Sequence, residues 1–591
     1  MVRFSQEEAM FLDRLAKDVN EVNKNLNQSV GTLIEKWAAQ IPENPAILYQ
    51  DDSWTWSAFN AEVNKVSNYF LELGLKPDES IALMLRNSAE YLFVTGGINK
   101  IQGISGLINF NQKKRALIHS FNKVEPKVVI VGGASLPAFN EIFDELGYKT
   151  NQVFVINNLD DIPHDFLDLS SELNSVSTAN PKTTHDSNLN QIAYYIFSSG
   201  TTGLPKAIKM VQKKLFTQGL FLGKSLAELT PKDVIYIATP LYHNLAIGQC
   251  LMAAYLSGGA TAIARRFSAS EYWKEIKKFG ATYTCYVGEM PRYLLNQPPT
   301  ENEKNTPLKV MVGIGLRKEI WEKFRARFHV QHIYEYYGLT ESHRAFLNVE
   351  EEPGMVGRNT MPGMILAKVN PETAEFYKNE KGFHVKCKKP EDIGMALVKL
   401  DKFDFFARYK DEAKTKKKLM YNVFRNNDCY FDTGDLLELH EGAWLSFFDR
   451  TGDTFRWKSE NVSTMEVESI LNSYESIVTS TVYAVKVPNT EGRAGMAAIK
   501  LDPNLKFDLE DFSRFILEVL PIYSIPVFIR IRDELEMTGG TLKVIKFDLR
   551  KDGYDIGVVK DQLYFWNSSM KKYVPLDKAM YQRILNGNVK I

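Results

Sequence analysis

The chain has 591 residues, of which 44% are hydrophobic and 12% aromatic. Lysine plus arginine and aspartate plus glutamate each number 72, so no overall charge would draw the protein to nucleic acid or to an anionic membrane. This composition is typical of a folded chain with large cores, and the length predicts about four domains of roughly 150 residues each.

The four cysteines lie far apart and include no Cys-x-x-Cys pair, which argues against structural zinc and against a disulfide framework. The N-terminal residues lack the apolar core of a signal peptide, because charged residues such as Glu7, Glu8 and Asp13 interrupt it. We therefore expect a reducing, cytoplasmic environment.

Residues 6–27 carry apolar side chains at alternating spacings of three and four, which predicts an amphipathic helix. Acidic residues slightly outnumber basic ones in it, whereas a helix that binds a membrane surface is basic. We expect this N-terminal helix, within residues 1–29, to pack against the body of the protein.

From Val30 to about Gly133, helical patterns alternate with short apolar runs, as parallel α/β construction requires. Residues 160–190 are polar with little periodicity and are predicted to be a surface excursion. Residues 234–264 contain no charge and exceed the roughly 20 residues that a bilayer requires. Because Pro240 and the Gly258-Gly259 pair interrupt this run, we expect a buried α/β core there and not a membrane span.

Residues 194–207 read Tyr-Tyr-Ile-Phe-Ser-Ser-Gly-Thr-Thr-Gly-Leu-Pro-Lys-Ala, a buried strand followed by a loop of glycines, hydroxyls and one lysine. Such a loop can bring backbone N–H groups close to phosphate oxygens. It is not the common nucleotide loop, because Leu204 and Pro205 separate the lysine from the second glycine. The candidate phosphate-binding residues are Ser198, Ser199, Gly200, Thr201, Thr202, Gly203 and Lys206.

Four further segments occur in the chain: Tyr293-Leu-Leu-Asn-Gln-Pro-Pro, Phe448-Asp-Arg-Thr-Gly-Asp-Thr-Phe-Arg-Trp-Lys, Glu460-Asn-Val-Ser and Tyr573-Val-Pro-Leu-Asp. Together with the phosphate loop, they make the chain resemble the adenylate-forming superfamily, which includes the acyl-CoA synthetases. More narrowly, the chain is similar to the fatty acid transport protein and very-long-chain acyl-CoA synthetase branch. The resemblance runs from about residue 30 to the C-terminus.

This resemblance implies a mixed α/β (α+β) fold with a large N-terminal body of several subdomains and a small, mobile C-terminal α+β domain. The adenylation body would span residues 30–449 and the small domain residues 450–591. The hinge would lie at residues 449–453, where Gly452 can absorb a large backbone rotation.

The resemblance also assigns the nucleotide site to two glycine-containing segments, one at residues 313–317 and one at residues 334–341. Tyr337 would offer an aromatic face to adenine, and Glu341 would bind magnesium, which prefers one or two carboxylates with phosphate oxygens and water. Thr340 and Glu341 are expected to act together in catalysis. The remaining nucleotide contacts would be Gly313, Gly315, Leu316, Tyr336 and Gly338.

Four more roles follow from the family motifs. Asp435 would accept hydrogen bonds from the ribose hydroxyls, with Arg450 near the ribose or phosphate. Lys543 would meet the α-phosphate and His243 would lie beside the acyl carbonyl, where it can gate the pocket. The chain departs from its relatives at Ile314, where they carry Asn, and at Ser459, where they carry Gly beside the CoA arm.

We therefore expect a fatty acyl-CoA synthetase, a ligase for long- or very-long-chain fatty acids, that uses ATP, CoA and Mg²⁺ and acts through an acyl-adenylate. The alternatives are a fatty acid uptake protein with acyl-activating activity, or an adenylating ligase for another acid or acceptor. Nucleic acid is not expected as a partner, and peripheral association with the inner face of a membrane stays open. The sequence does not define the preferred acyl length or the oligomeric state.

Overall fold

The computed structural model describes residues 4–157, 162–198, 205–342, 344–360, 363–370, 375–400, 409–450, 455–457, 460–488, 490, 492–537 and 544–589. The chain divides into two compact units. The first comprises residues 1–362 and 400–419, and the second comprises residues 363–399 and 420–591. The predicted boundary and hinge at 449–453 stay a prediction, since residues 451–454 lie outside the described residues.

One sheet of the first unit has the strand order β15-β14-β13-β12-β10-β11-β1-β2. Its inner pairs are parallel, and the edge pairs β1–β2 and β14–β15 are antiparallel. The strands are β1 (Pro45–Tyr49), β2 (Asp52–Thr55), β10 (Val234–Ile237), β11 (Ala260–Ile263), β12 (Tyr283–Val287), β13 (Val310–Ile314), β14 (His332–Gly338) and β15 (Ala345–Asn348).

The other sheet of this unit has the order β7-β6-β5-β3-β4-β8-β9 and is parallel except for the pair β8–β9. Every residue of its central strand β3 is buried, which is typical of a parallel strand covered on both faces. The strands are β3 (Ser80–Met84), β4 (Ile104–Leu107), β5 (Val128–Gly132), β6 (Val153–Ile156), β7 (Leu167–Asp168), β8 (Ile192–Ser198) and β9 (Lys206–Val211).

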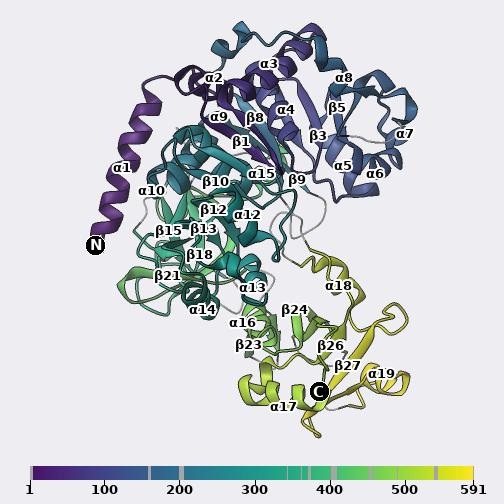
Figure 1. Ribbon diagram of the computed structural model, residues 1–591. Helices are drawn as coiled ribbons and strands as arrows, with labels where there is room; N and C mark the ends of the chain where they lie inside the picture. Colours follow the sequence, from purple (N-terminus) through teal and green to yellow (C-terminus); the bar gives the residue numbers. More distant parts are fainter. Residues whose placement is uncertain are drawn as a thin grey trace. The chain divides into compact units, whose positions relative to one another are not determined.

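Helices α2 (Val30–Gln40), α3 (Trp56–Glu72) and α4 (Ala89–Lys100) pack against one another beside these sheets (Figure 1). Every residue of α4 except Glu90 is buried, as expected of a helix that is apolar on nearly all sides. Gly97 permits close contact with α3, because a Cβ atom there would lie 2.6 Å from the side chain of Val66.

The other helices of the first unit cover the sheets and their edges. They are α5 (Lys114–Val124), α6 (Leu136–Asn140), α7 (Phe143–Leu146), α8 (Leu169–Glu172), α9 (Gln212–Gly219), α10 (Ser225–Ala227), α12 (Tyr272–Phe279), α13 (Glu289–Leu295), α14 (Lys318–Phe328) and α15 (Glu412–Lys416). The short strand β16 (Gly357–Arg358) contacts β15.

The predicted N-terminal helix is α1 (Gln6–Asn23), which begins with a capping box between Ser5 and Glu8. It packs on the first unit as expected: Phe11 and Phe221 meet edge to face at 5.4 Å, and Arg14 Nε donates to the Ser225 carbonyl at 3.2 Å. The helix ends before residue 27, because the Asn25 side chain accepts from the Asn27 N–H and so competes with helical hydrogen bonding.

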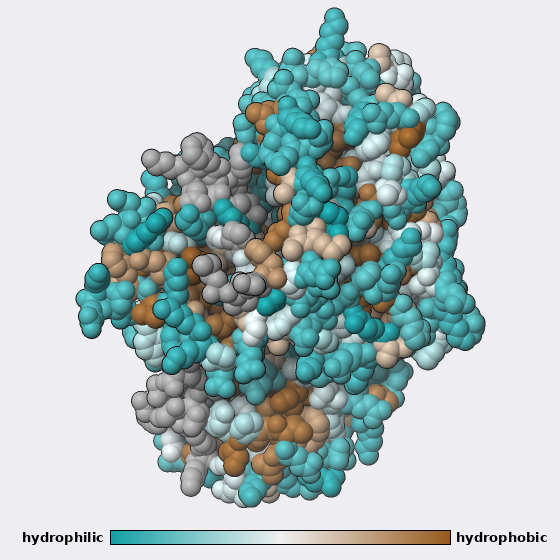
Figure 2. All heavy atoms as spheres, turned by 90° about the vertical axis from the view of Figure 1, so that its left-hand side faces the viewer, coloured by the Kyte–Doolittle hydropathy of each residue, from teal (hydrophilic) through white to brown (hydrophobic). Residues whose placement is uncertain are grey.

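The uncharged stretch at residues 234–264 is a buried α/β core, as predicted. It forms β10, the π-helix η7 (Leu245–Leu251), the helix α11 (Met252–Ser257) and β11. Within the described residues, no helix has both the length and the apolar character needed to cross a bilayer. On the face drawn in Figure 2, hydrophilic residues predominate and hydrophobic residues occur in small groups.

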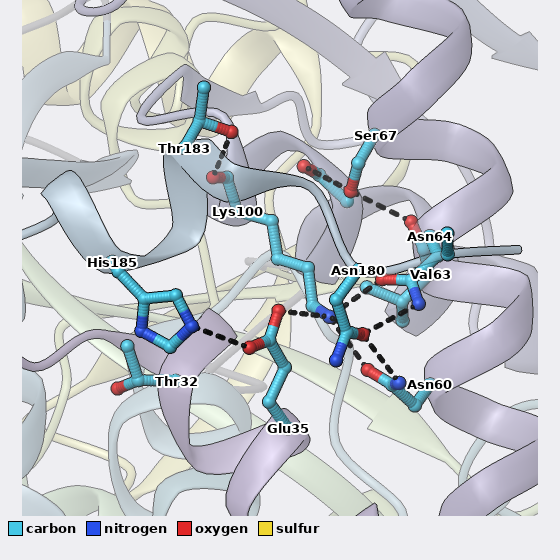
Figure 3. Close-up of polar contacts among 12 residues, drawn as sticks. Thr32, Glu35, Asn60, Val63, Asn64, Ser67, Lys100, Asn180, Thr183 and His185 are labelled. Atoms are coloured by element: carbon cyan, nitrogen blue, oxygen red, sulfur yellow. Dashed lines mark hydrogen bonds and ion pairs between the residues drawn. The ribbon is translucent and has the colours of Figure 1, made fainter.

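The polar segment before the phosphate loop is bonded to helix α3 by asparagine side chains, of which Figure 3 shows Asn60 and Asn64 beside Asn180. Asn60, Asn64 and Asn68 recur every four residues, and their amides bond Asn180 Oδ1, the Thr178 carbonyl and the Ser177 carbonyl at 2.7 to 2.8 Å. The predicted surface excursion is therefore anchored through a regular polar face of one helix.

The second unit contains two hydrophobic cores. Antiparallel strands β17 (Met364–Lys368), β18 (Ile393–Lys399), β20 (Cys429–Leu439) and β21 (Trp444–Arg450) surround one of them. The strand β19 (Leu419–Tyr421) lies at the boundary between the units.

The other core lies beneath the five-stranded sheet β24-β25-β26-β27-β28, which is antiparallel except for the pair β25–β26. Its strands are β24 (Ile477–Val485), β25 (Ala494–Leu501), β26 (Phe528–Ile531), β27 (Gln562–Asn567) and β28 (Lys572–Pro575). The hairpin β22 (Phe455–Trp457) and β23 (Glu460–Val462) and helices α16 (Thr464–Leu471), α17 (Leu509–Val519), α18 (Phe547–Asp552) and α19 (Lys578–Leu585) complete it.

Candidate nucleotide and acyl-activation site

The predicted phosphate loop connects two antiparallel neighbours in the first unit. Ser198 at the end of β8 and Lys206 at the start of β9 are partners in the register of these strands. The loop is therefore held at both ends by paired backbone. Ser199, Gly200, Thr201, Thr202 and Gly203 lie outside the described residues, so their phosphate contacts stay a prediction.

The tyrosine side chain of Tyr409 contacts both the lysine of this loop, Lys206, and the predicted metal ligand, Glu341. The Lys206 ammonium is 5.0 Å from the ring centroid of Tyr409, whose hydroxyl donates to Glu341 Oε1 at 2.6 Å. Ser198 Oγ also donates to Glu341 Oε1, at 3.5 Å. The fold thus brings Ser198, Lys206 and Glu341 together, while their roles toward phosphate and magnesium stay predictions.

Tyr409 lies within the candidate site but was not predicted from the sequence. It pairs with Ile208 of β9 through an isolated antiparallel bridge, and the next residue donates its N–H to the Ala207 carbonyl at 2.8 Å. These backbone contacts fix the tyrosine beside the start of strand β9. Nothing in the local sequence marks it, because its partners are remote in the chain.

Thr340 and Glu341 form a turn after β14. The Lys214 ammonium, from helix α9, donates to the carbonyl of Thr340. Burial lowers the pKa of Lys214 to about 7, while the charge of Glu341 acts in the opposite direction. No role for Lys214 was predicted from the sequence, because it is one of two adjacent lysines and no motif distinguishes it.

The residues around Glu341 fit a magnesium ion that is held mainly by a nucleotide. Glu341 is 8% exposed, and the hydroxyl of Ser198 lies beside it. Within the described part of the chain, no group of three or more His, Cys, Asp or Glu side chains is arranged to hold a metal. One carboxylate suffices for Mg²⁺ where phosphate oxygens and water supply the other ligands.

The glycines of the predicted purine turn are required by close backbone contacts. A Cβ atom at Gly313 would lie 2.3 Å from the Tyr286 carbonyl oxygen, and Gly315 has a φ of +85°. The Glu335 carboxylate supports this turn by accepting from the Gly315 N–H, from the Leu316 N–H at 3.2 Å and from the Tyr286 hydroxyl at 2.6 Å. Burial raises the pKa of Glu335 to about 8, although these bonds act to lower it.

The tyrosines of the second nucleotide segment are largely buried. Tyr336 and Tyr337 are each 6% exposed, and the hydroxyl of Tyr336 accepts from the Gln249 amide. Gly338 pairs with Ala345 of β15. His243 follows β10, and its Nδ1 accepts from the Leu245 N–H at 3.3 Å. Adenine stacking on Tyr337 and a gating role for His243 stay predictions.

The predicted ribose residues belong to the second unit. Asp435 and Arg450 are register partners on the antiparallel strands β20 and β21. Asp435 is 2% exposed, and its N–H donates to Thr433 Oγ1 at 3.0 Å. The side chain of Arg450, together with Ser459 and Lys543, lies outside the described residues.

Comparison with known proteins identifies the enzyme family to which this fold and candidate site belong. The chain belongs to the family of AMP-binding enzymes, because residues 34–382, more than half of it, match the family model described as "AMP-binding enzyme". The predicted resemblance is thereby confirmed.

Two relatives narrow this assignment. The long-chain fatty acid transport protein 6 of Mus musculus is 34% identical over 576 residues, which cover 95% of this chain and 91% of the relative. A medium/long-chain-fatty-acid–CoA ligase of Mycobacterium tuberculosis is 32% identical over 93% of this chain and 90% of its own length.

A solved structure shows the same fold at lower identity. The anthranilate CoA ligase AuaEII in complex with anthranoyl-AMP has a TM-score of 0.74 and 21% identity, and covers 89% of this chain and 97% of the ligase. This likeness confirms the predicted mixed α/β class.

Proposed function

We propose that this enzyme joins a fatty acid to coenzyme A in two ATP-dependent steps. First, a carboxylate oxygen of the acid attacks the α-phosphorus of ATP, and the bond to the bridging oxygen of pyrophosphate breaks. Acyl-AMP and pyrophosphate result. Second, the thiol sulfur of CoA attacks the acyl carbonyl, AMP leaves, and the thiol proton passes to solvent.

The observation that carries this proposal is the cluster of Lys206, Tyr409, Ser198 and Glu341 in a chain of the AMP-binding family. Lys206 and the loop donors would bind the departing pyrophosphate, and Tyr409 would hold the Glu341 carboxylate in place. Magnesium bound at Glu341 would neutralise phosphate charge. Fixed charges of this kind act where negative charge develops in the transition state.

The family resemblance supplies the remaining roles. Lys543 would stabilise charge on the α-phosphate, Asp435 and Arg450 would bind the ribose, and His243 would border the acyl carbonyl. Rotation of the small domain about residues 449–453 would convert the enzyme from the form that makes acyl-AMP to the form that makes the CoA thioester. A fatty acid is the favoured substrate because both relatives described above are named for long- or medium-chain fatty acids.

A second candidate function is fatty acid uptake, which the name of the mouse relative favours. Uptake and acyl activation are compatible, because conversion to the thioester traps the acid. Peripheral association with the inner face of a membrane would suit both functions. A pure binding protein would bind acid or nucleotide without exchanging pyrophosphate.

The test is exchange of labelled pyrophosphate into ATP with fatty acids of increasing length, with and without CoA. We expect acid-dependent exchange in the absence of CoA and acyl-CoA when CoA is added. Exchange without a CoA product would indicate another acceptor, and no exchange with any fatty acid would contradict the proposal.

A further inference from the structure

The buried lysine of helix α9 is not explained by the motifs of the family. Lys214 is 1% exposed, whereas a lysine is almost never fully buried unless its charge has a partner. Moving an ammonium out of water costs several kcal/mol even after the protein relaxes. A methionine would fill the same space without this cost, so the charge or the donor capacity of Lys214 must serve the site around it.

The partner of Lys214 is part of the candidate site. Its ammonium donates to the carbonyl of Thr340, the residue directly before Glu341. The Glu341 carboxylate itself accepts from Tyr409 and Ser198. The turn that presents this carboxylate is therefore held both through its backbone, by Lys214, and through the Glu341 side chain, by Tyr409 and Ser198.

Helix α9 also connects this turn to the phosphate loop. Strand β9 begins at Lys206 and ends at Val211, and α9 begins at the next residue. Lys206 and Lys214 thus belong to one continuous strand and helix. The contact between Lys214 and Thr340 joins the exit of the phosphate loop to a turn 126 residues away in the sequence.

We propose that Lys214 is a positioning residue for the magnesium nucleotide: its ammonium fixes the Thr340–Glu341 turn relative to strand β9, which begins at Lys206. This inference rests on the proposed function, because it takes Glu341 to be the magnesium ligand. If the inference is right, loss of the contact raises the Mg²⁺ concentration that the enzyme requires, while the thermal unfolding midpoint changes little.

The test uses three substitutions of Lys214 in the full chain. Lys214→Met removes both charge and donor, Lys214→Gln keeps a neutral donor, and Lys214→Arg keeps the charge and donors. The adjacent Lys213→Met is the matched control, because Lys213 lies on the same helix and is only half-buried. The measurements are the Mg²⁺ dependence of pyrophosphate exchange, the dissociation constant of ATP with and without Mg²⁺ in the absence of acid, and the thermal unfolding midpoint.

We expect Lys214→Met to raise the Mg²⁺ concentration for half-maximal exchange by about tenfold or more, as for loss of a hydrogen bond from a charged donor. ATP binding should weaken chiefly when Mg²⁺ is present. Lys214→Arg should recover most of the loss, Lys214→Gln should fall between, and Lys213→Met should match the wild type.

Two outcomes would overturn the inference. One is a Lys214→Met protein whose Mg²⁺ dependence equals that of Lys213→Met. The other is loss of folding in both Lys214→Met and Lys214→Gln, which would make Lys214 a structural residue. A wild-type enzyme without any Mg²⁺-dependent exchange would instead contradict the proposed function, so the two failures are distinguishable.

Discussion

Two lysines of the first unit are equally buried but have different surroundings. Lys100 at the end of α4 is 0% exposed and Lys214 on α9 is 1% exposed. Lys100 donates to Glu35 at 2.8 Å, Asn60 at 2.6 Å, Asn64 at 2.7 Å and Asn180 at 3.3 Å. Figure 3 shows these acceptors around its ammonium. Among the described residues, the hydrogen bond of Lys214 is to the backbone carbonyl of Thr340.

The difference indicates separate roles for the two ammonium groups. The partners of Lys100 come from α2, α3 and the segment before β8, so its bonds hold parts of the fold together. Because a fully paired buried charge stabilises one arrangement of its partners, we interpret Lys100 as structural. In the part of the chain that the structure describes, Lys214 donates to the carbonyl of Thr340, and the charge of Glu341 acts on it.

The largest expected effect is the loss of free energy of unfolding in Lys100→Met. Lys100→Met leaves Glu35, whose side chain is 9% exposed, without its main partner. Removal of one member of a buried ion pair costs about 3–5 kcal/mol in the free energy of unfolding. Urea unfolding would measure this loss, and Glu35→Gln in the same chain should restore part of it.

The Mg²⁺ dependence of pyrophosphate exchange should be unchanged in the folded Lys100→Met protein. A shift comparable to that of Lys214→Met would contradict the division between the two lysines.

A second effect concerns pH. The pKa of Lys100 is lowered from 10.5 to about 8 because burial outweighs its bond and attraction to Glu35. Between about pH 8 and 10.5 the unfolded chain binds more protons at this residue, so its contribution raises the free energy of unfolding with pH, by about 3 kcal/mol at most. Below pH 8 the residue is charged in both states and its contribution is constant.

Urea unfolding of the wild type and of Lys100→Met across this range isolates the contribution. The wild type should gain stability relative to the variant as pH rises. Parallel pH profiles would show that the ammonium of Lys100 is not desolvated in the folded protein.

A smaller effect is expected at Tyr409. Tyr409→Phe keeps the ring below Lys206 but removes the hydroxyl that donates to Glu341. Loss of a hydrogen bond to a charged group should cost about 1.5 kcal/mol or somewhat more, which is roughly a tenfold change. We expect the Mg²⁺ requirement of exchange to rise by this factor while the unfolding midpoint changes little. Equal Mg²⁺ titrations for the wild type and Tyr409→Phe would show that the hydroxyl of Tyr409 does not support magnesium binding.

Much of the fold was predictable because local patterns determine it. The apolar run before the phosphate loop is β8, and the uncharged stretch at residues 234–264 is a buried core. The motifs also predicted roles for Ser198, Lys206 and Glu341, and these residues lie close together in the fold.

The supporting contacts were not predictable, because they join segments remote in sequence. Tyr409 and Glu341 are 68 residues apart, and Lys214 and Thr340 are 126 apart. A single tyrosine or lysine carries no periodic signal. Asn60, Asn64 and Asn68 are four residues apart and therefore share one face of α3. This spacing could have predicted a polar contact surface on the helix, which the segment at residues 177–180 occupies.

The central claim is that Glu341 binds the magnesium of the nucleotide in an adenylating enzyme. The most direct measurement is a Mg²⁺ titration of fatty-acid-dependent pyrophosphate exchange for the wild type and Glu341→Gln, with the unfolding midpoint of each as control. Glutamine keeps the volume and removes the charge, so we predict a Mg²⁺ midpoint at least about tenfold higher with little change in stability. Superimposable titrations of the two proteins would contradict the account.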